Sequence, residues 1–123
     1  MPYNKKIILI SSDADLANAI LLESDKRKYK LHVEVDSISG YRSIQRHHPN
    51  FIFLDTHCHG TELCRRIKNN PELRSIPLIL IMENELEIQT ALTLDLGADD
   101  YVTRPFPVAV SYTHLRAHET RHD

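Results

Sequence analysis

Three short runs of consecutive apolar residues constrain the fold of this chain more than any other feature. They are Ile7–Ile10, Phe51–Leu54 and Leu78–Met82, and a polar residue follows each one directly. Such runs are typical of strands that are buried on both faces of a parallel sheet. They are far shorter than the roughly 20 residues that a membrane helix needs. We therefore expect a parallel sheet at the core and no membrane-spanning segment.

Segments with a helical repeat separate these runs. Apolar residues recur every three or four positions within 16–20, 38–44, 63–67 and 88–96. The spacing of Ser12 and Asp15 resembles a capping box, which predicts that the first helix begins there. Gly97 is expected just beyond the end of the last of these helices.

Two weaker patterns complete the alternation of strands and helices. Leu31, Val33 and Val35 alternate with polar residues, which is typical of a strand with one wetter face near a sheet edge. Tyr101–Val102 predicts a short fifth strand. Five strands alternating with four helices predict right-handed crossovers and a doubly wound α/β fold. Sites in such folds lie at the carboxyl ends of the strands.

Length, charge and cysteine content exclude several classes of protein. A chain of 123 residues fits one domain. Its 15 Lys and Arg and 17 Asp and Glu give a net charge of -2, so no basic surface for nucleic acid or a membrane is expected. The first apolar run is too short for a signal peptide, and 2 cysteines do not make a disulfide framework. We expect a cytoplasmic protein with reduced thiols.

Polar residues after the apolar runs should converge on one crevice. Those residues are Ser11, Ser12, Asp13, Asp55, Glu83 and Arg104, together with Met82. Asp55 is the chemical centre of the group, because a carboxylate can attack a phosphoryl group where cations offset the growing charge. The alternative is that Asp55 only caps the next turn.

Four ordered blocks resemble the response-regulator receiver domain, the CheY-like family. The blocks are Phe51–Asp55, Gly60–Lys68, Ile76–Leu80 and Gly97–Phe106, and the resemblance runs from about Lys5 to Phe106. It implies a flavodoxin-like five-stranded parallel sheet in the order 2-1-3-4-5. It also implies a regulatory module of two-component phosphorelay signalling that is not itself an enzyme.

The resemblance implies roles for individual residues of this crevice. Asp55 matches the aspartate that accepts phosphate from a histidine kinase. Arg104 matches the family's lysine, and its planar guanidinium is expected to pair with Asp55 through two hydrogen bonds. Tyr101 matches the aromatic residue that turns inward on activation, and Pro105 follows a peptide bond that is cis in the family.

Several positions depart from the family's pattern. Ser11 and Ser12 stand where an acidic pair normally holds Mg²⁺, and hydroxyls replace carboxylates poorly on that cation. Met82 stands where a hydroxyl residue normally contacts the phosphoryl group, and a thioether cannot donate a hydrogen bond. A magnesium site would then depend on Asp55, on Asp13, and on His57. Asp13 stands one residue after the positions of the acidic pair, and His57 lies in a loop that is shorter than the family's.

Two functions therefore stay open on the sequence. One is a phosphorylated receiver with Asp55 as phosphoacceptor, and the other is a pseudo-receiver that acts as a phosphorylation-independent protein-interaction module. The resemblance implies a sensor histidine kinase or phosphotransfer protein as partner, a fused output domain, and a homodimer. Residues 64–71 are similar to receivers fused to diguanylate cyclase. A flavin-binding protein is a third class, but Ser11–Ser12 is too short for its phosphate loop.

The end of the chain has a different character. Residues 1–109 are expected to form the receiver-like domain, whereas 110–123 resemble translated sequencing-adapter sequence and are expected to be non-native. The fifth helix of the fold would then be truncated or replaced. Two groups of residues have side chains of the types that bind metals. The first group lacks the usual zinc spacing and consists of His57, Cys58, His59 and Cys64. The second group lies in this tail and consists of His114, His118 and His122.

Overall fold

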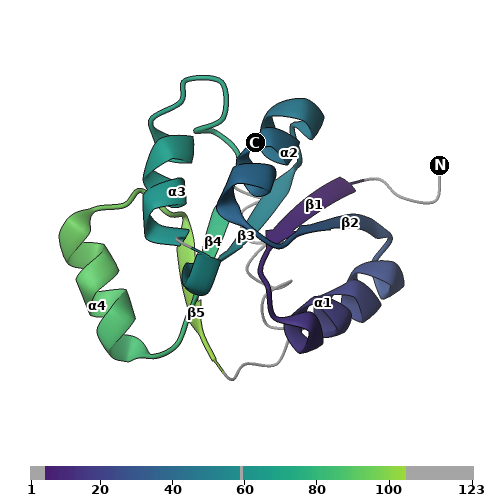
Figure 1. Cartoon of the computed structure of the whole chain (residues 1–123), viewed down its shortest axis with the longest axis horizontal. Coiled ribbons are helices and arrows are strands. Elements are labelled where there is room, and N and C mark those ends of the chain that lie inside the picture. The colour runs from purple at the N-terminus through teal and green to yellow at the C-terminus, as the bar shows by residue number, and fades with distance from the viewer. Residues whose placement is uncertain (1–4, 59, 105–123) are drawn as a thin grey trace.

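The computed structural model describes residues 5–58 and 60–104 as strands alternating with helices around one sheet (Figure 1). In chain order the elements are β1 (Lys5–Ile10), α1 (Ala14–Lys26), β2 (Tyr29–Glu34), α2 (Ser37–His47), β3 (Phe51–Asp55), the 3-10 turn η1 (Thr56–Cys58), α3 (Gly60–Lys68), β4 (Leu78–Met82), α4 (Glu85–Leu94) and β5 (Asp100–Thr103). The expected alternation of strands and helices is therefore confirmed over these residues.

The five strands form one parallel sheet in the order β2-β1-β3-β4-β5. Strand β1 pairs with β2 on one side and with β3 on the other, so the chain crosses back over its first strand after β2. Strands β4 and β5 then extend the sheet from β3. This is the order expected of the flavodoxin-like fold, and it brings the carboxyl ends of all five strands to one edge of the sheet.

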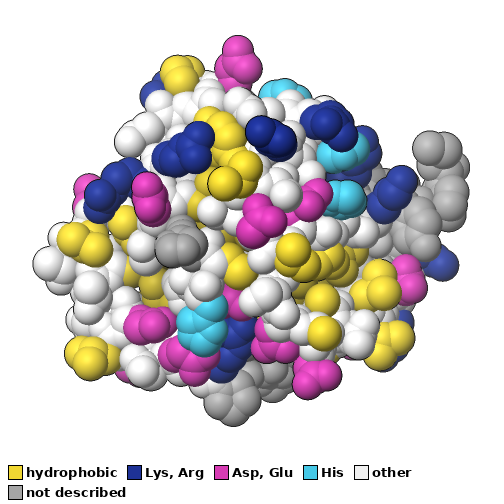
Figure 2. Space-filling view, viewed as in Figure 1, with side chains coloured by type: hydrophobic (Ala, Val, Ile, Leu, Met, Phe, Trp, Pro, Cys, Tyr) yellow, Lys and Arg dark blue, Asp and Glu magenta, His cyan; other side chains and the backbone are white. Residues whose placement is uncertain are grey.

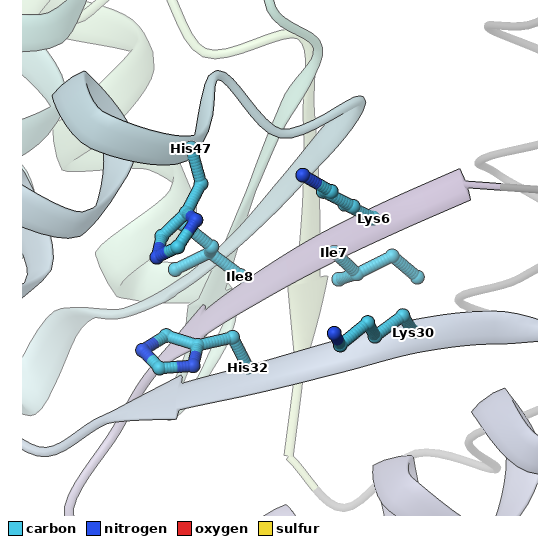
Figure 3. Close-up of a pocket in the computed structure, with 6 residues that line it drawn as sticks. All are labelled: Lys6, Ile7, Ile8, Lys30, His32 and His47. Atoms are coloured by element: carbon cyan, nitrogen blue, oxygen red, sulfur yellow. The ribbon is translucent and has the colours of Figure 1, made fainter. Parts of the chain in front are cut away.

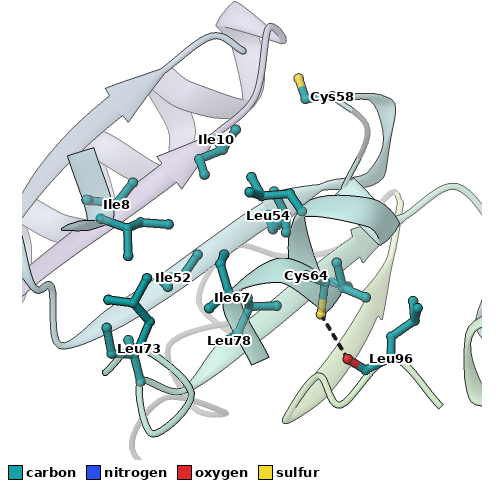
Figure 4. Close-up of a cluster of buried hydrophobic side chains, with 14 of the residues drawn as sticks. Ile8, Ile10, Ile52, Leu54, Cys58, Cys64, Ile67, Leu73, Leu78 and Leu96 are labelled. Carbon is teal, nitrogen blue, oxygen red and sulfur yellow. Dashed lines mark hydrogen bonds between the residues drawn. The ribbon is translucent and has the colours of Figure 1, made fainter. Parts of the chain in front are cut away.

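The central strands are buried on both faces, as their unbroken apolar runs indicate. Alternate residues of β1 contribute to opposite clusters, since Ile8 and Ile10 face one cluster and Ile7 and Leu9 face the other. The first cluster also includes Ile44 of α2 and Ile67 of α3. Figure 4 shows part of this cluster. Helices α2, α3 and α4 therefore cover one face, and α1 packs on the other.

The edge strand β2 has the wetter environment that its alternating pattern predicted. It pairs only with β1 among the described strands. Leu31 packs against the core cluster on the α1 face, but Val33 is 37% exposed. The strand ends at Glu34, so Val35 lies beyond it and is exposed rather than part of the strand.

Two predicted helix ends differ from the structure by one to three residues. The N-cap of α1 is Asp13, not Ser12, because the Asp13 side chain accepts from the backbone N–H of Leu16 at 3.1 Å. Helix α4 ends at Leu94, further before Gly97 than expected, and its C-cap Asp95 takes the left-handed conformation with φ 51°. An aspartate tolerates that conformation better than most residues.

Several predictions fall outside the described residues. They are the non-native tail (110–123), the domain boundary at 109, the truncated fifth helix, Pro105, His59, and the histidines His114, His118 and His122. These stay predictions. Within the residues that the structure describes, no helix is both long enough and apolar enough to cross a membrane.

A close approach between α3 and the end of β3 places the turn that follows Asp55. Gly60 begins α3, and a Cβ atom added there would lie 2.8 Å from the backbone oxygen of Asp55 and 3.4 Å from Cγ of Leu54. Atoms this close overlap, and a backbone oxygen cannot turn aside as a side chain can. Only glycine therefore allows the helix to start so near the end of the strand.

We predict that Gly60→Ala lowers the free energy of unfolding by about 2 kcal/mol, because the added methyl group forces the strand and helix apart. Urea denaturation followed by circular dichroism measures this. The matched control is Thr61→Ala at the next, exposed position of α3, which should change the stability by less than about 0.5 kcal/mol. Equal stabilities of the two variants would contradict the close approach.

Candidate functional site

Asp55 carries a buried carboxylate at the carboxyl end of the central strand. It is the last residue of β3, it pairs in register with Ile81 of β4, and it is only 1% exposed. The parallel topology brings the ends of β1, β4 and β5 around it. A charged group in this position is costly unless hydrogen bonds and an opposite charge compensate its loss of water.

Three residues donate hydrogen bonds to the two oxygens of Asp55. Ser11, directly after β1, donates its hydroxyl to Oδ2 at 2.7 Å. The backbone N–H of His57 donates to Oδ1 at 3.0 Å. Arg104 donates from Nη2 to Oδ2 at 2.6 Å and from Nη1 to Oδ1 at 3.3 Å. The guanidinium therefore binds both carboxylate oxygens, which is the two-bond pairing that the sequence predicted.

Arg104 is held in place by its backbone as well as by its side chain. It follows β5, and its N–H donates to the carbonyl of Met82 at the end of β4 at 2.8 Å. Its guanidinium also lies 3.4 Å from Glu83 and 3.7 Å from Asp13. The side chain is 18% exposed, so three carboxylates share one cation at the rim of the crevice.

Glu83 is a part of this network to which the sequence assigned no role. Its carboxylate lies 2.9 Å from Nε2 of His57, in addition to its contact with Arg104. The one available signal was its place directly after the fourth strand. Figure 2 shows acidic, basic and histidine side chains side by side on the lower surface of the molecule.

The environment of the pair favours the charged form of both partners. Burial acts to raise the pKa of Asp55, but the hydrogen bonds from Arg104, Ser11 and the His57 N–H outweigh it, and the pKa is lowered. The hydrogen bond to Asp55 raises the pKa of Arg104. Asp55 is therefore ionised at neutral pH, and the guanidinium is its counter-charge.

The positions that depart from the receiver pattern lie in different structural environments. Ser11 is buried and bonded to Asp55, whereas Ser12 is exposed and takes no part in the network. Asp13 caps α1 with one oxygen and faces Arg104 with the other. Met82 is buried in the core cluster. Tyr101 is half-buried against the same cluster, and burial raises its pKa.

The residue types that could hold a metal ion do not gather. Among residues 5–58 and 60–104, no three His, Cys, Asp or Glu side chains lie together as a metal site would require. The His57 ring turns to Glu83, and only its backbone reaches Asp55. The thiol of Cys58 donates to the carbonyl of Val35, and that of Cys64 donates to the carbonyl of Leu96. Burial raises the pKa of Cys64 to about 11, so it stays a thiol.

We predict that Arg104→Gln lowers the free energy of unfolding at pH 7 by about 3 kcal/mol, because it leaves a buried carboxylate without its counter-charge. Urea denaturation at several pH values measures this. The exposed Arg65→Gln is the matched control and should be nearly neutral.

The pH dependence adds a second test of the same variant. Because the pKa of Asp55 is lowered in the folded chain, its contribution is complete above the unfolded value of about 4 and is lost as the pH falls through the folded value. The stability difference between the natural chain and Arg104→Gln should therefore shrink below about pH 4. A difference that is independent of pH would contradict the pairing.

No protein-family model matches the chain. Solved structures with the same fold do match. The receiver domain of a signal-transduction histidine kinase from Syntrophus aciditrophicus superposes with a TM-score of 0.87 at 23% identity, over 98% of this chain and 93% of that one. A receiver-modulated diguanylate cyclase from Pelobacter carbinolicus gives 0.79 at 24% identity, over 96% and 94%.

A third structure is that of the receiver domain of a sensor histidine kinase from Pseudomonas aeruginosa PAO1. It superposes with a TM-score of 0.82 at 23% identity, over 93% of this chain and 96% of that one. That domain has a magnesium ion coordinated in its active-site cleft. At these identities the likeness concerns the fold, and the chain therefore has the fold of response-regulator receiver domains.

Proposed function

We propose that this chain is a receiver-type regulatory module of two-component signalling that works through protein contacts, as a pseudo-receiver, without phosphoryl transfer. The observation that carries the proposal is the guanidinium of Arg104 on both oxygens of Asp55. A fixed cation there neutralises the carboxylate permanently. The neighbouring groups that a phosphoryl acceptor would need are also absent, since Met82 cannot donate a hydrogen bond.

Magnesium fits this arrangement poorly. Mg²⁺ requires oxygen ligands in near-octahedral geometry and is held by one or two carboxylates together with phosphate oxygens and waters. Both oxygens of Asp55 are already engaged by donors, and the neighbouring position holds the hydroxyl of Ser11 rather than a second carboxylate. The free oxygen of Asp13 faces Arg104. The cation of this crevice is therefore the arginine itself.

The alternative function is a phosphorylated receiver with Asp55 as phosphoacceptor. It is favoured by the place of Asp55 at the end of the central strand in a fold that superposes on a magnesium-binding receiver. In that case a sensor histidine kinase or phosphotransfer protein would supply the phosphoryl group, and Arg104 would have to leave one carboxylate oxygen before attack could occur.

Exposed apolar residues on α4 support a role in protein contacts. Leu86 is 75% exposed, and Leu92 and Leu94 are also exposed on this helix. Leu86 and Leu94 line one hollow together with Thr56 and His57, and apolar side chains grouped in this way beside a polar crevice are typical of a surface that binds a partner. Helix α4 begins at Glu85, two residues after Glu83, and the backbone N–H of Glu83 donates to Glu87 of this helix at 2.8 Å, so a partner on α4 and the Asp55 network would influence one another. The partner would be a two-component protein, a fused output domain such as a diguanylate cyclase, or a second copy, in the cytoplasm.

Incubation of the purified chain with Mg²⁺ and acetyl phosphate, followed by intact mass spectrometry, separates the two functions. The pseudo-receiver should gain no phosphoryl mass, because Arg104 occupies the carboxylate. Asp55→Asn is the matched control, since it keeps the shape of the side chain and removes the acceptor. A phosphoryl group that appears on the natural chain and is missing from Asp55→Asn would overturn the proposal in favour of the phosphoacceptor.

A gain-of-function variant tests whether the missing groups are the cause. Ser11→Asp with Met82→Thr restores a second carboxylate and a hydroxyl beside Asp55, so phosphorylation should rise above the level of the natural chain. Adding Arg104→Lys should raise it further, because a compact ammonium cannot hold both carboxylate oxygens. An unchanged yield in all variants would contradict the account of why the natural chain is not phosphorylated.

A further inference from the structure

A second polar site lies at the opposite edge of the sheet from Asp55, where β1 and β2 begin. Lys6 and Ile8 of β1 stand in register with Lys30 and His32 of β2, so these four side chains share one face. Helix α2 ends over the same face with His47. Together they line a hollow of about 150 Å³, into which the two imidazole rings and both lysine side chains point (Figure 3).

The lining of this hollow carries one sign of charge. Lys6 and Lys30 pair directly across the two strands, an arrangement in which like charges destabilise a sheet. The rings of His32 and His47 lie 5.4 Å apart. Basic and histidine side chains also gather in Figure 2 over the end of α2 and the start of β1, with Arg46 in the last turn of α2.

Few carboxylates compensate this charge. Glu34, two residues along β2 from His32, lies 2.6 Å from Nε2 of that ring and accepts a hydrogen bond from Ser43, so it compensates the charge on the His32 side of the hollow. Among the residues that the structure describes, neither Lys6 nor Lys30 forms an ion pair with a carboxylate. Burial, and then the charges of His32 and the neighbouring basic residues, lowers the pKa of His47, which agrees with an uncompensated positive field.

The size and floor of the hollow limit what could occupy it. Its floor is made by the buried side chain of Ile8, whereas Ile7 lines the hollow from β1 with its own side chain in the cluster on the other face of the sheet. The four polar side chains around this floor are exposed to solvent. The volume of about 150 Å³ is well below the roughly 300–1,000 Å³ of pockets for drug-sized ligands, and it equals a few water molecules. A small, compact anion fits these limits.

We propose that this hollow binds a phosphate group, either free or at the end of a small phosphomonoester, between Lys6, Lys30, His32 and His47. The two ammonium groups supply charge, and the imidazole of His47 supplies an N–H donor. Nε2 of His32 already contacts Glu34, so only the other nitrogen of that ring is left to donate. A bound dianion would offset the repulsion between the paired lysines. This site is independent of Asp55 and of the function proposed for it.

Nuclear magnetic resonance of the histidine imidazoles tests the proposal on the whole chain. Inorganic phosphate and glycerol phosphate are titrated separately, with chloride at matched ionic strength as the reference. We expect saturable shifts of His32 and His47 with the phosphates and none with chloride. Tighter binding of glycerol phosphate would identify a monoester as the ligand, and equal or weaker binding would identify free phosphate.

The double variant Lys6→Gln, Lys30→Gln should weaken phosphate binding by at least about tenfold, because both opposing charges of the hollow are lost. The matched control is Lys26→Gln on α1, on the other face of the sheet, which should change the affinity less than about twofold. Without phosphate, the double variant should melt no lower than the natural chain, since it loses a repulsion. It should also lose the phosphate-dependent rise in melting temperature.

The dependence on pH gives a further readout. The charged or titratable groups that line the hollow are Lys6 of β1, Lys30 and His32 of β2, and His47 of α2. Glu34 acts on His32 and Arg46 acts on His47 from beside the hollow. Sulfate, whose charge is constant near neutrality, should bind more tightly as the pH falls and His47 becomes protonated. Shifts that chloride reproduces, or equal losses in the double variant and Lys26→Gln, would overturn the proposal.

Discussion

A buried carboxylate at the end of the central strand is the constraint on which the candidate site depends. Asp55 has almost no contact with water, so its charge must be satisfied by groups that the fold brings to it. Ser11 comes from the end of β1, the His57 N–H from the turn after β3, and Arg104 from the end of β5. The hydrogen bonds to Asp55 therefore join three separate parts of the chain at one edge of the sheet. All of these bonds depend on the parallel strand order.

The same pairing explains how the crevice differs from that expected of a receiver that binds magnesium. A guanidinium is a permanent cation with fixed donors, whereas a metal ion can be replaced and shares its ligands with a phosphoryl group. Glu83 and Asp13 surround Arg104 and hold it over Asp55. The protein thus carries its counter-charge within its own chain. Under the function proposed above, changes of state come from partners on α4 rather than from a metal-dependent reaction.

The fold could be predicted from the sequence because its signals are local and repeated. Unbroken apolar runs such as Ile7–Ile10 require burial on both faces, and only a covered parallel sheet supplies it. The pairing of Asp55 with Arg104 could be predicted because both stand at the carboxyl ends of strands, at positions that match the aspartate and the lysine of the family that the sequence resembles. Glu83 could not be assigned a role, since its contacts with Arg104 and His57 depend on how two loops turn after their strands. The cap of α1 was misplaced by one residue because Ser12 and Asp13 are both good caps, and only the backbone decides between them.

A double-mutant cycle between Asp55 and Arg104 tests the central claim most directly. The free energies of unfolding of the natural chain, Asp55→Asn, Arg104→Gln and the double variant are measured at pH 7 in low salt. Because the two groups form a desolvated, two-bond ion pair, the account predicts a coupling free energy of about 2 kcal/mol or more. Effects that add to within about 0.5 kcal/mol would show that the two residues act independently, and would contradict the account.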